Sequence, residues 1–106
     1  MRRALVVVTM TTLALGFAVG HASGGGKTVR AVNFDFKPKS VTVQKGSRVT
    51  WKNVEGKHTV TLKNGTFDKV ISGDETVSKR FRHRGTFRYI CRFHREQGMR
   101  GKVIVE

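Results

Sequence analysis

Apolar and polar residues alternate along most of the chain from about residue 28 onward. Val32, Phe34 and Phe36 share one parity and are expected on one inward face, as are Val49 and Trp51. A period of two with β-branched and aromatic residues predicts half-buried strands, because alternate side chains of a strand point to opposite faces of the sheet. We expect about seven such strands. They cover residues 31–36, 40–44, 48–52, 59–63, 77–82, 87–91 and 103–105.

Residues that favour turns separate the predicted strands. Pro38 divides the first two, and the later breaks contain Gly or Asn, which tolerate positive φ. These breaks are residues 44–47, 63–66, 72–74 and 83–85. After residue 22 no window has a convincing helical period. Short strands with regular turns predict an all-β chain folded as a β-sandwich.

The first 22 residues have a different character from the rest. Residues 1–3 include two arginines, residues 4–19 are apolar and uncharged, and small residues follow up to Ala22. This order predicts a secretory signal peptide at 1–22, with a retained membrane anchor as the alternative. The run is short for a membrane span. We therefore expect an exported protein, periplasmic or extracellular, with a flexible Gly-rich lead at 23–27 and one domain at 28–106 that contains no membrane span.

The single cysteine lies in a segment rich in possible metal ligands. Cys91 ends the inward-facing parity of its strand and should be at least partly buried, with His94 and Met99 close behind it and His58 in another strand. Each residue alone has a more ordinary interpretation, such as a small apolar core residue or a surface histidine. Together they form a donor set for copper, since two His, one Cys and a weak axial Met describe a blue-copper site. Cys91 has no partner for an internal disulfide, and metal ligation would explain it.

Two segments of the chain resemble one protein family. Residues 36–60 have the pattern Phe-x-Pro-x-x-Val-x-Val-x-x-Gly-x-x-Val-x-Trp-x-Asn, followed by His-Thr-Val. Residues 85–105 have Gly-Thr-Phe-x-Tyr-x-Cys-x-x-His-x-x-x-x-Met-x-Gly-x-Val-x-Val. With these patterns the chain resembles the cupredoxins, in particular the plastocyanin, amicyanin and pseudoazurin group. The Cys-to-Met spacing looks like plastocyanin. The middle of the sandwich is shorter than in the family, so no strand is assigned within residues 64–75.

The resemblance implies a Greek-key sandwich with one type 1 copper ion at one end. It implies His58, Cys91 and His94 as equatorial ligands and Met99 as the axial ligand, with the Thr59 amide hydrogen-bonded to the cysteine sulfur. The implied function is one-electron transfer between Cu(II) and Cu(I), and we do not expect an enzyme. A copper carrier or scavenger without an electron-transfer role is the alternative. A metal-free interaction module is a third hypothesis.

The charge of the chain predicts the kind of partner. Lys and Arg number 21 against 7 acidic residues, a formal net charge of +14. Such a field favours anionic partners. The last quarter is dense in arginine, at positions 80, 82, 84, 88, 92, 95 and 100. We expect a docking surface for an acidic redox protein, with a solvated face or association with an anionic surface as alternatives. We expect a monomer and no nucleic acid, because an exposed aromatic series is missing from the sequence pattern.

Overall fold

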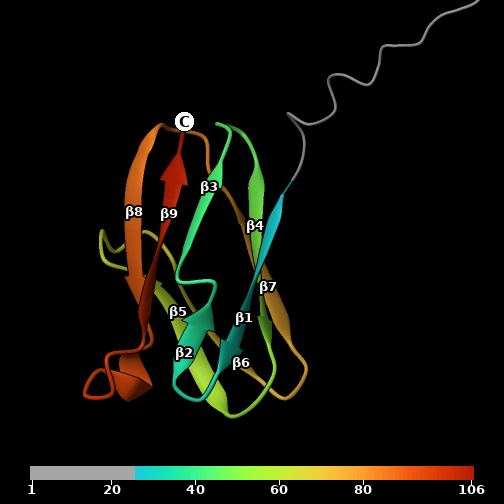
Figure 1. The fold of residues 1–106 in the computed structure, drawn as a ribbon, viewed down its shortest axis with the longest axis vertical. Coiled ribbons are helices and arrows are strands. Elements are labelled where there is room, and N and C mark those ends of the chain that lie inside the picture. The colour runs from blue at the N-terminus through green and yellow to red at the C-terminus, as the bar shows by residue number, and fades with distance from the viewer. Residues whose placement is uncertain (1–25) are drawn as a thin grey trace, which may run out of the picture.

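A computed structural model shows a sandwich of two β-sheets, and it describes residues 26–106 (Figure 1). The predicted signal peptide at 1–22 and residues 23–25 of the predicted lead lie outside the described residues. A one-turn 3-10 helix, η2 (Arg92–His94), follows the eighth strand. The strands are β1 (Lys27–Val32), β2 (Asp35–Lys37), β3 (Ser40–Val43), β4 (Arg48–Asn53), β5 (Lys57–Leu62), β6 (Asp68–Ser72), β7 (Thr76–Arg80), β8 (Gly85–Ile90) and β9 (Arg100–Val105).

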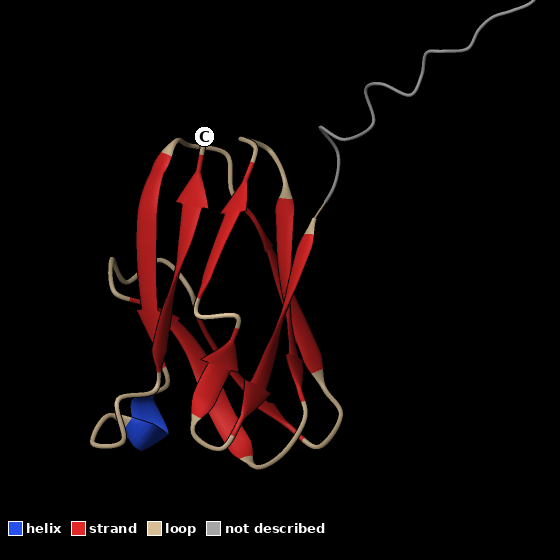
Figure 2. Ribbon diagram, in the orientation of Figure 1, coloured by secondary structure: helices blue, strands red, loops and turns tan. Residues whose placement is uncertain are grey.

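The sheets have the orders β2-β1-β4-β7 and β3-β9-β8-β5-β6. Most neighbouring strands are antiparallel, while β1 pairs with β4 and β3 pairs with β9 in parallel. Neighbours in a sheet are therefore often distant in sequence, because the chain crosses between the layers several times (Figure 2). The all-β sandwich predicted from the alternation is confirmed.

The core lies between the sheets and is formed largely by the side chains whose alternation predicted that they face inward. Trp51 of β4 stands edge-on to Tyr89 of β8, with ring centroids 5.3 Å apart, and Phe36 approaches the same tyrosine at 4.8 Å. Offset and edge-to-face aromatic pairs are the preferred geometries. Strand β3 alternates exposed and buried residues along its whole length, as a half-buried strand must. Burial of alternate side chains thus joins the two layers.

The structure has nine strands among its described residues where about seven were expected. One extra strand is β6, in the region where no strand was assigned. The other arises because residues 31–36 are not one strand: the chain turns at Asn33 and Phe34, and β2 runs back along β1. The expected inward face of this region was therefore wrong at Phe34, which is 46% exposed, whereas Ala31 and Phe36 are buried.

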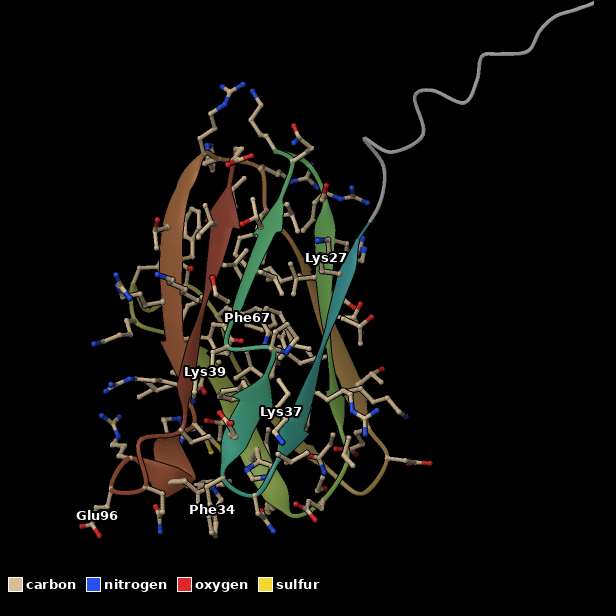
Figure 3. The ribbon with its side chains drawn as sticks, viewed as in Figure 1. Lys27, Phe34, Lys37, Lys39, Phe67 and Glu96 are labelled. Carbon is tan, nitrogen blue, oxygen red and sulfur yellow. The ribbon has the colours of Figure 1, made fainter. Side chains whose placement is uncertain are left out.

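One end of the sandwich collects the segments that matter for the predicted site. The β1–β2 turn, the β4–β5 connection and the loop after β8 lie together at the end opposite the C-terminus (Figure 1). Figure 3 shows Phe34 and Glu96 at this same end, although they are far apart in the sequence. Across the described residues, we find no helix with the length and apolar character that a membrane crossing requires.

Candidate metal centre

Three predicted donors meet at this end of the sandwich. Cys91 Sγ lies 3.4 Å from His94 Nδ1 and 3.8 Å from His58 Nδ1, and the two Nδ1 atoms are 3.2 Å apart. His58 stands near the start of β5, Cys91 directly follows β8, and His94 ends η2. Strands β5 and β8 are antiparallel neighbours, so their pairing brings residues more than thirty positions apart to one point.

The surroundings of His58 select one form of its ring. Its Nε2 lies 2.7 Å from the carbonyl oxygen of Glu55, which can only accept a hydrogen bond. Nε2 therefore carries the proton, and the lone pair of Nδ1 faces Cys91 and His94. Burial lowers the pKa of His58 from its usual value, and repulsion from His94 lowers it further against the raising effect of the Glu55 carbonyl. A neutral imidazole oriented through its second nitrogen is the usual state of a metal-binding histidine.

The sulfur of Cys91 is enclosed and has a backbone donor. Cys91 is 0% exposed, as the inward parity predicted. The Thr59 amide donates a hydrogen bond to Sγ at 3.4 Å, so the contact implied by the family resemblance is present. A thiolate here would have one N–H donor and two imidazole neighbours. Cys91 is the only cysteine in the sequence, so an internal disulfide is excluded.

The loop from Cys91 to Met99 closes on itself through its backbone. The Cys91 amide donates to the Met99 carbonyl at 3.0 Å, and the Met99 amide donates to the His94 carbonyl at 3.3 Å. Gly98 has φ of 73°, a conformation that glycine adopts without steric cost. This turn lets the chain reverse beside Met99, which is buried. The loop therefore holds its three predicted ligands in one compact unit.

A ring of polar groups joins this loop to β5 and β6. The Arg92 amide donates to Thr59 Oγ1 at 2.7 Å, Thr59 and Thr61 hydroxyls lie 3.0 Å apart, and Thr61 Oγ1 donates to Asp68 Oδ1 at 2.7 Å. The Arg92 Nε donates to the same Asp68 oxygen at 3.0 Å and closes the ring. A hydroxyl has one proton, so with Thr61 donating to Asp68 the proton between the two hydroxyls comes from Thr59. The Thr61 and Arg92 hydrogen bonds lower the pKa of Asp68.

The outer side of His94 borders exposed aromatic residues. The Phe34 ring lies 4.7 Å from the His94 ring, centroid to centroid, and Phe93 is also largely exposed. His94 itself is partly exposed, whereas His58 is fully buried. One imidazole of the cluster thus approaches the surface of the protein beside an exposed aromatic ring, and the other does not.

The spacing of the donors fits a first-row transition metal. Bonds of about 2.0 Å to nitrogen and about 2.3 Å to sulfur in a trigonal plane separate two nitrogens by about 3.5 Å and nitrogen from sulfur by about 3.7 Å. The three observed separations, 3.2, 3.4 and 3.8 Å, are close to these values. Thiolate and imidazole together suit copper, since soft sulfur favours Cu(I) and imidazole accepts both oxidation states. The three predicted equatorial donors therefore have the mutual separations that one such metal ion requires.

Sequence reasoning missed several residues around the site. The Glu55 carbonyl, the Thr59 hydroxyl and Asp68 had no signal in the sequence, because their roles depend on contacts between strands. Phe34 had a misleading signal, since its parity indicated the core. Of the two remaining histidines, His83 is exposed. His21 lies outside the described residues.

Comparison with known sequences identifies similar proteins. A family model described as copper binding proteins, plastocyanin/azurin family, matches residues 25–106. Amicyanin-alpha of Methylorubrum extorquens is 36% identical over 96 residues, covering 84% of this chain and 79% of the relative. A plastocyanin of Scenedesmus fuscus is 32% identical over 87 residues, covering 67% of this chain and 86% of the relative.

Comparison with solved structures gives the same architecture. The reduced state of a mutant amicyanin superimposes with a TM-score of 0.68 at 30% identity, covering 77% of this chain and 83% of that one. An oxidised plastocyanin of the fern Dryopteris crassirhizoma has a TM-score of 0.64 at 21% identity, covering 74% and 99%. At this lower identity the likeness supports the fold alone.

Proposed function

Because the chain belongs to the plastocyanin/azurin family of copper-binding proteins, we propose that it is an exported blue-copper protein that carries one electron at a time. The observation that carries the proposal is the convergence of one buried thiol and two Nδ1 atoms within 3.2–3.8 Å of one another. Such a soft and compact donor set suits a metal that alternates between Cu(II) and Cu(I).

We assign the ligand roles as follows. His58, Cys91 and His94 would hold one copper ion, and Met99 would be its weak fourth ligand, the axial one in the family pattern. Copper bound there would supply the Cu(II)/Cu(I) couple, by which the protein would take one electron from a reduced partner and pass it to an oxidised one. The protein holds the donors in place in both states: the Glu55 carbonyl orients His58, and the Thr59 amide orients the sulfur. Little rearrangement is then needed when the charge on the metal changes.

We place the exit for electrons at His94. Its ring is partly exposed and lies against the exposed Phe34 ring, and the neighbouring Phe93 is exposed as well, with the Lys57 and Arg92 cations over its ring. His58 is enclosed and offers no such route. The proposed reaction is electron transfer between proteins with no bond made or broken in a substrate, so the protein is a carrier and not an enzyme.

The remaining parts of the proposal concern location and partners. Residues 1–22 direct export and are removed, residues 23–27 are the lead, and the domain at 28–106 acts as a monomer in the periplasm or outside the cell. Its partner is a redox protein with an acidic docking surface, in accord with the net charge of +14 on the full chain. Nucleic acid is not a partner, and an anionic surface is at most an additional contact.

Copper titration of the purified chain without residues 1–22 tests this proposal. We expect one equivalent of Cu(II) to produce an intense thiolate-to-copper band in the visible spectrum, which ascorbate bleaches and mild oxidation restores. A competing Cu(I) chelator should remove little copper during repeated cycles. Absence of the band would overturn the proposal, while rapid loss of copper to the chelator would favour a copper carrier.

A further inference from the structure

The arginines that are clustered in the sequence are divided between two ends of the molecule. Strand β8 runs from Gly85, paired with Val105 near the C-terminus, to Ile90, paired with Arg100 beside the ligand loop. At about 3.3 Å per residue its two ends lie roughly 17 Å apart. One group therefore sits at the C-terminal end, and the other lies near the metal centre. The first group is Arg80, Arg82 and Arg84, and the second is Arg88, Arg92, Arg95 and Arg100, of which Arg92 is paired with Asp68.

Two members of the second group, Arg88 and Arg100, line a groove on the outer face of the five-stranded sheet. The groove has a volume of about 190 Å³ and includes Arg88, Arg100 and Lys102, together with Lys39 and Lys63. These five cations come from four separate parts of the sequence. No acidic residue lines the groove. Among the described residues, only Lys39 of these five forms an ion pair, with Asp35.

Like charges are placed opposite each other across this face. Arg88 of β8 is the direct cross-strand neighbour of Lys102 of β9, and the Lys63 amide donates to the Arg88 carbonyl from the other side. Like charges directly opposite each other in a sheet are destabilising. An anionic partner would relieve this repulsion. The arrangement thus favours a bound state in which carboxylates lie between the cations.

The groove continues toward the ligand loop. A second hollow shares Lys63, Ile90 and Arg100 with it and extends to Arg95 and Met99. Ile90 directly precedes Cys91 in the chain. A partner seated along both hollows would therefore lie close to the metal centre. The C-terminal group of arginines cannot serve this contact, because it lies at the far end of β8.

We propose that this basic groove, lined by Lys39, Lys63, Arg88, Arg100 and Lys102, is the docking site for the acidic face of a redox protein. The inference rests on the proposed function and names where the partner binds. Arginine forks bind carboxylates in two-point geometry, and a hollow admits the projecting side chains of a protein surface. Opposite charge across such a contact speeds encounter more than it tightens binding, as a short-lived electron-transfer complex requires.

The test compares two double variants that remove equal charge from different places. Arg88→Gln/Arg100→Gln changes the groove, and Arg82→Gln/Arg84→Gln is the control at the far end. Both are made in the copper-loaded protein, and a short poly-glutamate peptide is the probe in an NMR titration of the reduced form. We expect the groove variant to weaken peptide binding by about fivefold or more and the control by less than about twofold. The shifted amides should surround the groove.

The outcomes separate this inference from the proposed function. Equal weakening of peptide binding in both variants would show that the peptide responds to the overall positive charge, and it would overturn the groove as the docking site. Chemical shift changes confined to residues 80–84 would also overturn it. Binding to vesicles of mixed neutral and anionic lipid through the groove, without binding to the peptide, would also overturn it. The blue band and its reversible bleaching are measured in the same samples. Their loss in the unmodified protein would overturn the proposed function, whereas their presence without peptide binding would overturn the groove alone.

Discussion

The two segments that supply the metal centre are built in different ways. His58 and Thr59 belong to β5, which is paired with β6 on one side and with β8 on the other, and both residues are fully buried. The loop from Cys91 to Met99 belongs to no strand, and it is held by its own turns, by the ring through Arg92, by the Thr59 amide on Sγ and by burial of Cys91 and Met99. Its outer part faces solvent, and Figure 3 shows Glu96 at its tip, pointing away from the sandwich.

Because of this difference, the strand segment and the loop have different roles in the centre. The strand segment sets the position of one imidazole and of the amide that contacts the sulfur, because neither can move without breaking sheet pairing. The loop brings the remaining donors to that fixed place and exposes one of them. The proposed electron transfer needs both properties, since a rigid centre limits rearrangement and an exposed edge lets a partner approach. The following predictions test this division, from the largest expected effect to the smallest.

Replacement of the sulfur should have the largest effect. Cys91→Ser removes the only cysteine sulfur, which the loop supplies and the strand segment contacts through the Thr59 amide. We therefore expect the intense blue band to disappear entirely while the fold remains. Absorption spectroscopy of the copper-loaded variant measures this. Circular dichroism provides the control for folding, and a persistent band in a folded variant would contradict the assignment of Cys91.

The two histidines should respond differently to removal. In His94→Gly the missing ring leaves a gap near the surface, and added imidazole should restore the blue band. In His58→Gly the gap is buried, and the Glu55 carbonyl loses its donor, so added imidazole should restore little. Spectra recorded over a series of imidazole concentrations make the comparison. Equal recovery in the two variants would show that the segments do not differ in access.

Removal of the thioether should change the potential without loss of copper. Met99→Leu keeps the approximate volume of the side chain but removes the proposed axial thioether, and we expect the lost lone pair to matter more for the more highly charged Cu(II) than for Cu(I). We expect the blue band to remain and the reduction potential to rise, since axial ligands tune this potential. Voltammetry measures the shift. Leu62→Met, a size-conserving change in the core, is the control, and an unchanged potential in Met99→Leu would argue against the axial role.

Opening the polar ring should have a moderate effect. Thr59→Val leaves the Arg92 amide without its acceptor and should lower the free energy of unfolding by about 1 to 3 kcal/mol. Because Arg92 follows Cys91, the energy of the blue band should shift as well. Thr50→Val is the control, because Thr50 and Ser78 both lie in the four-stranded sheet, away from the ring. Loss of their 2.8 Å contact should reduce stability by about 1 kcal/mol without a spectral shift. A blue band at the same energy in Thr59→Val and in Thr50→Val would show that the ring does not position the loop.

The carboxyl of this ring should give the smallest effect, visible only in its pH dependence. The pKa of Asp68 is lowered in the folded state, so its contribution to stability is present above the ordinary carboxyl pKa and is lost as the pH falls through the lowered value. The difference in unfolding free energy between the original chain and Asp68→Asn should be constant above about pH 5 and shrink below about pH 4. Denaturant unfolding of the copper-free proteins measures it, and a difference that does not shrink in acid would contradict the assignment.

The strands of the core were predictable where apolar residues on one face alternated regularly with polar residues on the other. Val41 and Val43 of β3 and Val49 and Trp51 of β4 are buried as their alternation indicated. Phe34 shows where this reasoning fails, because a turn reverses the chain and the same parity then points to another surface. The boundary of β1 is set by pairing with β2 and β4, and alternation within one segment carries no information about pairing.

By itself, the sequence determined the chemistry of the donors, the all-β class and the parity that buries Cys91, because these depend on residue type and on neighbours along the chain. Only the tertiary structure decided that His58 meets Cys91 and His94, that Thr59, Thr61, Asp68 and Arg92 form a ring, and that the arginines separate into two groups. The physical reason is the same in each case. These features depend on strand order and register, which bring together side chains that are distant in the sequence and separate some that are near.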